Sequence, residues 1–237
     1  DAIAKALGRR NCHRSIINWI NNMLITRRVQ ASLGDEEIIV GTTRGCPQGG
    51  VLSPQLWTFI VDELVTILNN QGFKTVCYAD DIVILINGAD VKILHEYMQE
   101  ALRITWEWCE NNSLSINPSK TSIIKFTRKR NAAIEPLKIK NTIIPFSNTV
   151  KYLGVMLDNK LTWNEHIDYI KRKAMVNLFT MKKLASNYTG LSPEMAKYLY
   201  NQTIIPTITY GALVWWPKTN QTTTNKKFNK IQLLTIR

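Results

Sequence analysis

Two adjacent aspartates, Asp80 and Asp81, stand between two runs of aliphatic and aromatic residues in the segment Val76–Ile86, VCYADDIVILI. Each run has the length and the content of β-branched residues that are typical of a buried β-strand. The segment therefore predicts a strand, a tight turn and a second strand, with both acids at the turn and at the edge of a hydrophobic core. This feature constrains the fold more than any other in the sequence.

Two like charges backed by apolar strands repel each other and lose hydration, so a cation or a proton is needed to relieve the cost. Mg²⁺ is commonly held by one or two protein carboxylates together with water and substrate phosphates. We therefore interpret Asp80 and Asp81 as part of a phosphoryl-transfer site. For the pair alone, the alternative is an ordinary solvated hairpin turn, because Asp is a common turn residue.

A second segment, Arg44–Pro54, RGCPQGGVLSP, contains three glycines and two prolines and leads into an apolar-periodic segment. We expect a loop followed by a helix, with Ser53 as its N-cap and Pro54 in its first turn. Glycine lets the backbone approach a ligand closely, and a helix N-terminus offers unpaired N–H groups to phosphate. The alternative is a structural turn, but a simple connector would not need this combination of residues.

The glycine-rich segment Arg44–Pro54 and the tetrad Tyr78–Asp81 resemble, in their order and spacing, the reverse transcriptase family. The chain is most similar to the enzymes of non-LTR retrotransposons, and the resemblance covers nearly its whole length. Ala79, before the acidic pair, differs from the methionine that retroviral enzymes usually carry and from the glycine of viral RNA polymerases.

The resemblance implies an α+β fold: a right-hand polymerase palm, with an antiparallel sheet backed by helices, part of the fingers and a helical thumb. Residues 1–158 would form the fingers and palm portion, and residues 159–237 the helical thumb and a downstream segment. A chain of 237 residues with 45% hydrophobic content is long enough to bury a substantial core.

The resemblance also assigns roles to the glycine-rich loop, which would lie beneath the templating base pair and the incoming nucleotide. The nucleotide- and template-binding residues would be Arg44, Pro47, Gln48, Gly49 and Gly50. Of these, the arginine would approach a nucleic-acid phosphate.

The catalytic residues implied by the resemblance are Asp80, Asp81 and Lys120, with the two aspartates as metal ligands. The lysine belongs to Asn117–Thr121, which matches an Asn-Pro-x-Lys-Thr motif. It would lie near the outer phosphates of the nucleotide, where an ammonium group offsets charge or donates a proton to departing pyrophosphate. The alternative is a solvated lysine at a turn.

Further along, Thr149–Asp158 alternates like a strand and contains a glycine at which another backbone could come close. It is similar to the primer grip of reverse transcriptases, a hairpin that holds the 3′ end of the primer against the acids. The residues carried over by this similarity are Tyr152, Leu153 and Gly154.

Charge is distributed unevenly along the chain, whose net charge is +12. Residues 1–118 hold 10 Lys and Arg against 13 Asp and Glu, a balance of −3, whereas residues 119–237 hold 20 against 5, a balance of +15. Dispersed basic residues of this kind favour a nucleic-acid partner. A generically basic, soluble surface is the alternative.

Cysteine spacing and hydropathy bear on the compartment. The four cysteines show no CxxC pairing, which argues against a zinc site or a disulfide framework and favours four free thiols in a reducing compartment. We expect an intracellular location, in the nucleus, the cytoplasm or both. The sequence has no 18-residue apolar run and no signal-peptide pattern at its start, so we expect no membrane partner.

Two-metal nucleotidyl transfer in this family needs a third carboxylate, which follows an apolar run in an earlier strand. No such run precedes the glycine-rich loop. Asp1 has no strand before it, and Asp35 and Asp62 fall in a predicted turn and a predicted helix. We therefore expect a fragment of a larger polyprotein, with the third acid just upstream of Asp1, and a chain that by itself binds metal weakly and polymerises poorly.

The function implied by the resemblance is that of an RNA-directed DNA polymerase. The intact protein would add dNTPs to a DNA primer on an RNA template with two Mg²⁺ ions, Mn²⁺ being a second candidate. Two alternatives remain: a catalytically inactive nucleic-acid-binding remnant or domesticated module of the same fold, and a relative of group II intron maturases.

Overall fold

The structure is a computed structural model that describes residues 2–42, 45–127, 135–184 and 192–236. The chain divides into two compact units. Unit 1 comprises Asp1–Pro118 and Ala133–Ile143, and unit 2 comprises Ser119–Ala132 and Ile144–Arg237. These units do not coincide with the predicted ranges, which were 1–158 for the fingers and palm and 159–237 for the thumb and a downstream segment. The assignment of those ranges to fingers, palm and thumb stays a prediction.

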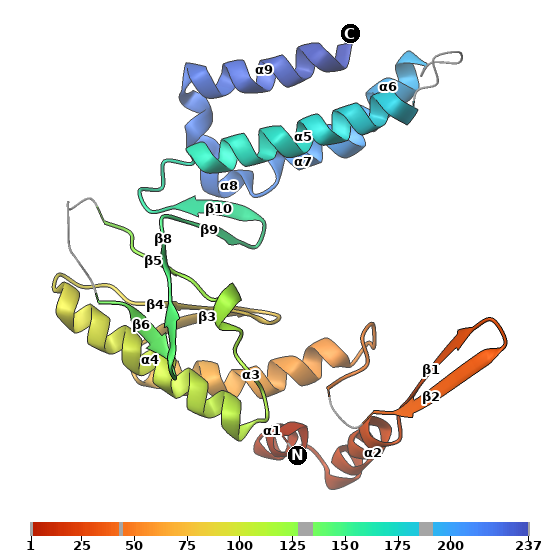
Figure 1. Cartoon of the computed structure of the whole chain (residues 1–237), viewed down its shortest axis with the longest axis vertical. Coiled ribbons are helices and arrows are strands. Elements are labelled where there is room, and N and C mark those ends of the chain that lie inside the picture. The colour runs from red at the N-terminus through yellow and green to blue at the C-terminus, as the bar shows by residue number, and fades with distance from the viewer. Residues whose placement is uncertain (1, 43–44, 128–134, 185–191, 237) are drawn as a thin grey trace. The chain divides into compact units, whose positions relative to one another are not determined.

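Unit 1 combines helices with short antiparallel strand pairs (Figure 1). In chain order its elements are α1 (Ala2–Arg9), α2 (Arg14–Ile25), β1 (Arg28–Leu33), β2 (Glu36–Gly41), α3 (Ser53–Asn70), β3 (Lys74–Tyr78), β4 (Asp81–Leu85), α4 (Val91–Asn111), β6 (Leu137–Ile139) and β7 (Thr142–Ile144).

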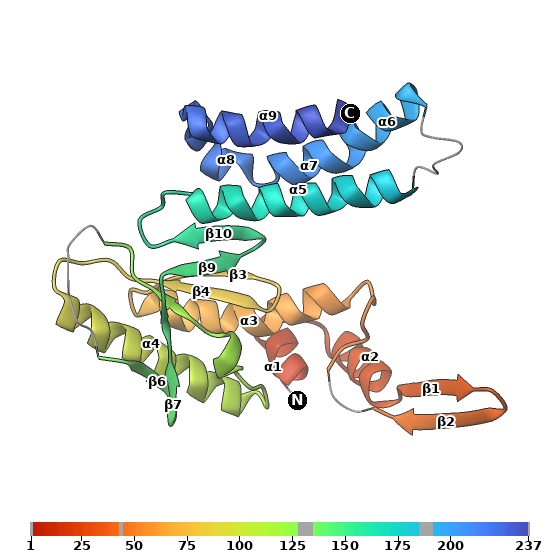
Figure 2. The ribbon, with the colours of Figure 1, turned by 45° about the horizontal axis from the view of Figure 1, so that its top comes forward.

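The main core of unit 1 lies where α1, α3 and α4 meet, because each helix turns an apolar stripe towards the others. Leu64, Leu68 and Ala101 are fully buried there. At the edge of this core, Trp108 donates its indole N–H to Glu63 at 2.9 Å, and Glu63 also pairs with Arg9. The β3–β4 ribbon lies along α3 in both views of the molecule (Figures 1 and 2).

The starts of α2 and α4 in unit 1 follow local capping chemistry. His13 precedes α2 and caps it by accepting a hydrogen bond from the backbone N–H of Ser15. Asp90 precedes α4 and accepts from the N–H groups of Lys92 and Ile93.

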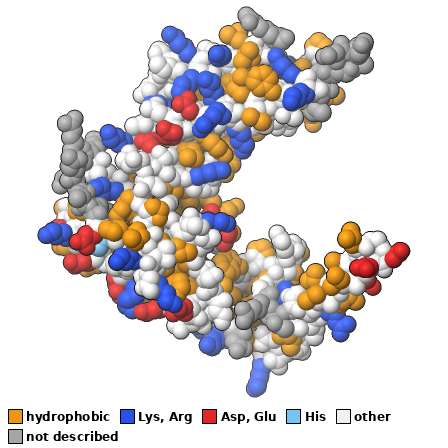
Figure 3. Space-filling model, viewed as in Figure 1, with side chains coloured by type: hydrophobic (Ala, Val, Ile, Leu, Met, Phe, Trp, Pro, Cys, Tyr) orange, Lys and Arg blue, Asp and Glu red, His pale blue; other side chains and the backbone are white. Residues whose placement is uncertain are grey.

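The β1–β2 hairpin extends away from the helices of unit 1, and all residues of both strands are exposed. Its register places one apolar set of side chains on a common face. This set is Val29, Ala31, Leu33, Ile38 and Val40. Figure 3 shows hydrophobic side chains along this hairpin.

Unit 2 contains small strand pairs followed by a group of helices. Its elements are η1 (Pro118–Lys120, which starts at the last residue of the first segment of unit 1), β5 (Ile123–Ile124), β8 (Phe146–Ser147), β9 (Thr149–Tyr152), β10 (Val155–Asp158), α5 (Asn164–Leu184), α6 (Pro193–Leu199), the π-helix η2 (Tyr200–Ile204), α7 (Ile205–Thr209), α8 (Ala212–Trp215), η3 (Trp216–Asn220) and α9 (Thr222–Ile236).

The long helix α5 organises unit 2, because α7, η2 and α9 all pack against it (Figure 2). Ala174 and Leu178 of α5 meet Ile204 and Ile231 in one buried cluster, and Trp215 meets the start of α5 in another. Ser192 caps α6 by accepting a hydrogen bond from the N–H of Met195, and Pro193 is the first residue of this helix.

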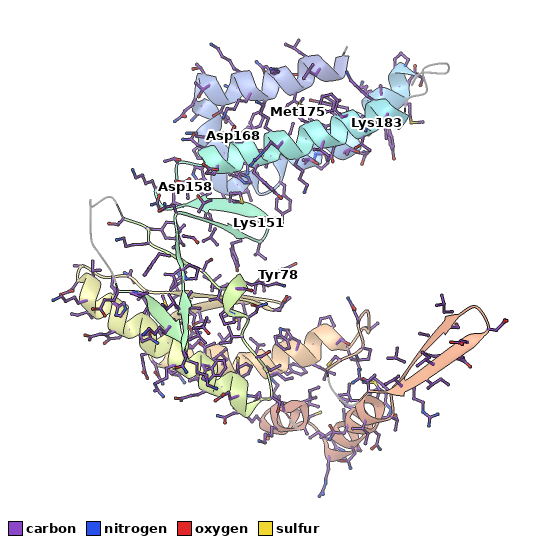
Figure 4. The ribbon with its side chains drawn as sticks, in the orientation of Figure 1. Tyr78, Lys151, Asp158, Asp168, Met175 and Lys183 are labelled. Carbon is purple, nitrogen blue, oxygen red and sulfur yellow. The ribbon has the colours of Figure 1, made fainter. Side chains whose placement is uncertain are left out.

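Asp158 ends β10 and fixes the connection to α5 (Figure 4). Its buried carboxylate accepts backbone hydrogen bonds from Lys160, Thr162 and Trp163 at 3.2, 2.9 and 2.7 Å. Burial by itself raises the pKa of a carboxyl group, but these N–H donors outweigh burial and hold the pKa of Asp158 below its ordinary value.

The mixture of helices and small sheets makes this an α+β fold, as the sequence predicted. All four cysteines are free thiols, which is also as predicted. Among the described residues, no helix combines the length and the apolar character needed to cross a bilayer.

Candidate active site

The acidic pair lies at the turn of the β3–β4 hairpin. The strands are antiparallel, and their last residue pair is Tyr78 with Asp81, so Ala79 and Asp80 alone form the turn. Ala79 has a φ of 50°, in the left-handed region that an L-residue adopts at a cost of about 1 kcal/mol or more. Such a conformation persists where neighbouring contacts enforce it.

Trp57 of α3 provides such a contact. Its indole N–H donates a hydrogen bond to the carbonyl oxygen of Ala79 at 2.6 Å. The residue directly before Asp80 is therefore attached to α3. The contact spans 22 residues of chain, and no local pattern predicts it.

One face of the β3–β4 hairpin packs on the helices, and the other is open to solvent. The pairs Cys77 with Ile82 and Thr75 with Ile84 face the core. Tyr78 and Asp81 share the opposite face, where the tyrosine is 64% exposed (Figure 4). The prediction of two buried strands is therefore wrong: this is a two-stranded ribbon, with helices behind only one of its faces.

Both Asp80 and Asp81 are exposed. The predicted loss of hydration is not observed, because the first aspartate lies in the turn itself and the second points from the open face. Consecutive carboxylates in this position nevertheless offer the oxygen ligands that Mg²⁺ prefers, and their exposure leaves space for water and phosphate. Within the described parts of the chain, no three His, Cys, Asp or Glu residues come together as a metal-binding cluster.

The glycine-rich loop forms a compact bend before α3. The N–H of Gly50 donates to the carbonyl of Pro47 at 3.1 Å, and Gly49 has a φ of 79°. A Cβ at position 50 would lie 2.8 Å from Oγ of Ser53 and 3.2 Å from O of Pro47, so the bend requires glycine there. Gln48 and Gly49 are exposed at the outside of the bend.

Ser53 begins α3, but it does not cap the helix as predicted. The N-cap position is Leu52, which makes no side-chain capping bond, while Pro54 stands in the first turn as expected. The hydroxyl of Ser53 instead donates to the carbonyl of Pro47 at 2.6 Å. The side chain therefore closes the bend instead of satisfying the N–H groups of the helix.

Arg27 supports the loop from the end of α2, donating to the carbonyl of Gly45 at 2.8 Å and to that of Leu24 at 2.9 Å. Burial raises the pKa of the Cys46 thiol, although the charge of Arg27 partly opposes this. Arg44, predicted to approach a phosphate, lies outside the described residues.

Helix α3 brings the loop and the acidic turn together. Ser53, its first residue, closes the bend, and Trp57, about one helical turn later, holds the carbonyl before Asp80. The two segments that carry the strongest sequence signals thus attach to the same end of one helix.

The remaining predicted site residues belong to unit 2. Lys120 is the last residue of η1 and is exposed. Tyr152 and Val155 form the last pair of the β9–β10 hairpin, and the two turn residues, Leu153 and Gly154, have φ values of 44° and 82°. Positive φ at both central residues is what a type I′ hairpin turn requires, and Gly154 adopts it without steric cost.

The family of the chain follows from comparison with known proteins. Residues 1–157 match the family described as Reverse transcriptase (RNA-dependent DNA polymerase), which is well over half of the sequence. The chain therefore belongs to the reverse transcriptase family.

Similar proteins include the Retrovirus-related Pol polyproteins from type-1 retrotransposable element R1 of Bradysia coprophila and Nasonia vitripennis, which are 27% and 25% identical over 73% and 79% of the chain. The RNA-directed DNA polymerase from mobile element jockey of Drosophila melanogaster is 27% identical over 72% of the chain. The predicted likeness to the enzymes of non-LTR retrotransposons is confirmed.

The matched regions cover 17%, 57% and 19% of the lengths of these three relatives, so the chain corresponds to only part of each. No solved structure matches the chain significantly.

Proposed function

We propose that this chain is the polymerase segment of an RNA-directed DNA polymerase that extends a DNA primer with dNTPs on an RNA template. The observation that carries the proposal is the attachment of the acidic turn and the glycine-rich bend to one end of α3. This arrangement gives carboxylates for the transferring phosphate and an exposed backbone bend for the nucleotide that brings it.

Asp80 and Asp81 would hold the divalent ions, Mg²⁺ or Mn²⁺, which when bound would activate the 3′ hydroxyl and stabilise the pyrophosphate. The family generally uses divalent metal ions. The role of Trp57 would be to fix the turn so that both carboxylates keep one orientation. The proposed chemistry also requires a third carboxylate, which we expect upstream of Asp1. Primer extension should therefore be measured with a longer protein that carries these 237 residues.

The bend Pro47–Gly50 would receive the templating base pair and the incoming nucleotide, with Arg44 directed to a phosphate. Lys120, exposed at the end of η1, would supply a proton or positive charge at the departing pyrophosphate. In this proposal Tyr152, Leu153 and Gly154 form the primer grip, residues 1–158 the fingers and palm, and residues 159–237 the thumb and a downstream segment.

The charge of unit 2 supports nucleic-acid binding. Its sequence ranges hold 18 Lys and Arg against 4 Asp and Glu, and Figure 3 shows basic side chains over its helices. Basic residues that are dispersed over a surface suit a polyanionic backbone better than a small anionic ligand. An RNA template paired with a DNA primer is the proposed partner, and an intracellular location is the proposed setting.

Primer extension tests the proposal directly. The chain, and the longer protein that carries it, would be incubated with a DNA primer annealed to RNA, dNTPs and Mg²⁺. Replacing Asp80 by Asn should lower the extension rate of the longer protein by at least about 100-fold, more than loss of an outer-shell group costs a metal site. Asp35→Asn is the matched control, because Asp35 also lies in a two-residue hairpin turn and is exposed.

Undiminished extension by Asp80→Asn would contradict the assignment of the catalytic pair. Tight binding of the duplex without any extension by the longer protein would instead indicate a non-catalytic binding module.

A further inference from the structure

The turn of the β9–β10 hairpin is held by a residue far away in sequence. The hydroxyl of Tyr210 donates a hydrogen bond to the carbonyl oxygen of Leu153 at 2.9 Å, across 57 residues of chain. The ring of the same tyrosine covers Gly154: a Cβ at position 154 would lie 2.8 Å from Cε1 of Tyr210. Both residues of the turn are thus contacted by one side chain.

Tyr210 is itself fixed from behind. Its carbonyl oxygen accepts a hydrogen bond from the indole N–H of Trp215 at 2.9 Å, and Trp215 is fully buried. The next residue, Gly211, has a φ of 63°, and a Cβ there would lie 3.0 Å from Cγ2 of Val155. The segment around Tyr210 therefore fits closely against the first residue of β10.

The following residue of β10 is anchored to the same buried group of rings. The N–H of Met156 donates to Nδ1 of His166 at 3.2 Å, and the imidazole ring lies 5.5 Å from the ring of Trp215. His166 is fully buried at the start of α5. Trp215 thus supports the hairpin along two routes, through Tyr210 to the turn and through His166 to the strand.

We propose that Tyr210 is a positioning residue for the 3′ end of the primer, acting through the turn residues Leu153 and Gly154. The inference rests on the proposed function, in which this hairpin is the primer grip. By fixing the carbonyl of Leu153 and covering Gly154, the tyrosine restricts the turn to one conformation. A primer terminus that contacts this turn is then held in one orientation.

This role goes beyond packing, because the hydroxyl of Tyr210 is not needed to fill the core. Tyr210 is 55% exposed, and its hydroxyl contacts a half-buried turn. Removal of that one oxygen should leave the buried cluster around Trp215 intact. Its effect should therefore appear mainly in the use of the primer, with only a small loss of stability.

The first experiment replaces Tyr210 by Phe in the longer protein that carries the chain. Loss of one hydrogen bond should raise the KM for the primer–template duplex by about threefold to tenfold. The KM for dNTP should stay unchanged, and the melting temperature should fall by no more than about 4 °C. Tyr198→Phe is the matched control, because Tyr198 lies on α6 and is 61% exposed.

A second measurement does not depend on activity. Hydrogen exchange of the backbone amides at residues 153–155 should be faster in Tyr210→Phe than in the unchanged chain and in Tyr198→Phe. If exchange and the KM for the duplex both remain at the level of the control, Tyr210 has no positioning role.

A third variant tests the contact of the ring with Gly154. Gly154→Ala places a Cβ against the ring and should raise the KM for the duplex further than Tyr210→Phe does. Gly72→Ala controls for backbone strain, because Gly72 has a φ of 88° but open space around its Cα. Equal effects of the two alanine variants on the KM for the duplex would overturn the inference.

The outcomes separate this inference from the proposed function. If Asp80→Asn abolishes extension but Tyr210→Phe and Gly154→Ala behave like their controls, only the positioning role fails. If Asp80→Asn extends the primer normally, the proposed function fails first.

Discussion

At the scale of single residues, the candidate site depends on side-chain contacts with backbone carbonyls. Trp57 binds the carbonyl of Ala79, and Ser53 binds that of Pro47. Each contact fixes a backbone segment that contains or adjoins a residue with proposed chemistry. Such contacts are worth only about 1 kcal/mol each in stability, yet they decide where a carboxylate or an N–H group points.

Trp57→Phe tests this at the acidic turn. Phenylalanine keeps an aromatic ring but removes the N–H that binds Ala79, so the turn before Asp80 should become more mobile. We expect the kcat of primer extension to fall by about fivefold to tenfold and the free energy of unfolding to change by no more than about 1 kcal/mol. Steady-state extension kinetics and denaturant unfolding would measure the two effects.

Trp19→Phe is the control for that substitution, since Trp19 lies on α2 and is 58% exposed. If both tryptophan variants keep the full kcat, the hydrogen bond from Trp57 has no part in placing the acids.

At the scale of secondary-structure elements, the sequence predicted most of what local chemistry determines. The helix starts at His13 and Ser192, the two-residue turn that carries Asp80, and the sharp bend before α3 follow from the residues themselves. The N-cap at Ser53 was wrong because the nearby carbonyl of Pro47 competes for its hydroxyl. Capping patterns take no account of such a competitor.

Burial and distant contacts were less predictable. The strands beside Asp80 were predicted to be buried from their apolar content, and this prediction was wrong. Apolar content indicates that a strand can be covered on both faces, but not that a second element is present to cover it. The contacts of Trp57 with Ala79 and of Tyr210 with Leu153 join residues 22 and 57 positions apart. Neither pair has a periodic pattern or a motif that links its two members.

His166 gives a pH-dependent prediction for the junction between β10 and α5. Burial lowers the pKa of this histidine below its ordinary value. Below about pH 6.5 the unfolded chain therefore takes up a proton that the folded chain excludes, and the free energy of unfolding should fall as pH decreases towards the folded pKa. Above that range this histidine makes no pH-dependent contribution.

Replacing His166 by Asn keeps an acceptor for the N–H of Met156 but removes the titrating ring. The loss of stability between pH 7 and pH 5 should be smaller in this variant, as measured by denaturant unfolding at several pH values. The unchanged chain, measured in parallel, provides the reference profile. An unchanged pH profile in His166→Asn would exclude this residue as the source.

At the scale of the whole molecule, charge divides between the two units. The sequence ranges of unit 2 carry a balance of +14, and those of unit 1 carry 12 Lys and Arg against 14 Asp and Glu. Binding to a nucleic-acid backbone should therefore depend mainly on unit 2 and should weaken as salt concentration rises, because bound counterions are released from the phosphates.

The basic triplet Lys171–Lys173 of α5 makes this testable. Replacing all three residues by Gln should weaken binding of an RNA–DNA duplex and reduce the slope of log K against log salt by up to about 3. The loss should be similar for duplexes of different sequence, because phosphate contacts carry no sequence information. Fluorescence anisotropy at several salt concentrations would measure it.

A matched loss of charge in unit 1 provides the comparison, with Lys5, Lys74 and Lys92 replaced by Gln. Equal reductions of the slope in the two triple variants would contradict a binding surface on unit 2.

Helix α3 has a further consequence for the proposed enzyme. The bend that would receive a base pair and the hairpin that would carry the metal ligands both contact α3. They do so through Ser53 and Trp57, which are four residues apart on this helix. A mispaired base that shifted the bend would also displace the acids. Selection of the correct nucleotide and the speed of its incorporation would then be mechanically coupled, and substitutions that loosen the start of α3 would lower copying accuracy together with rate.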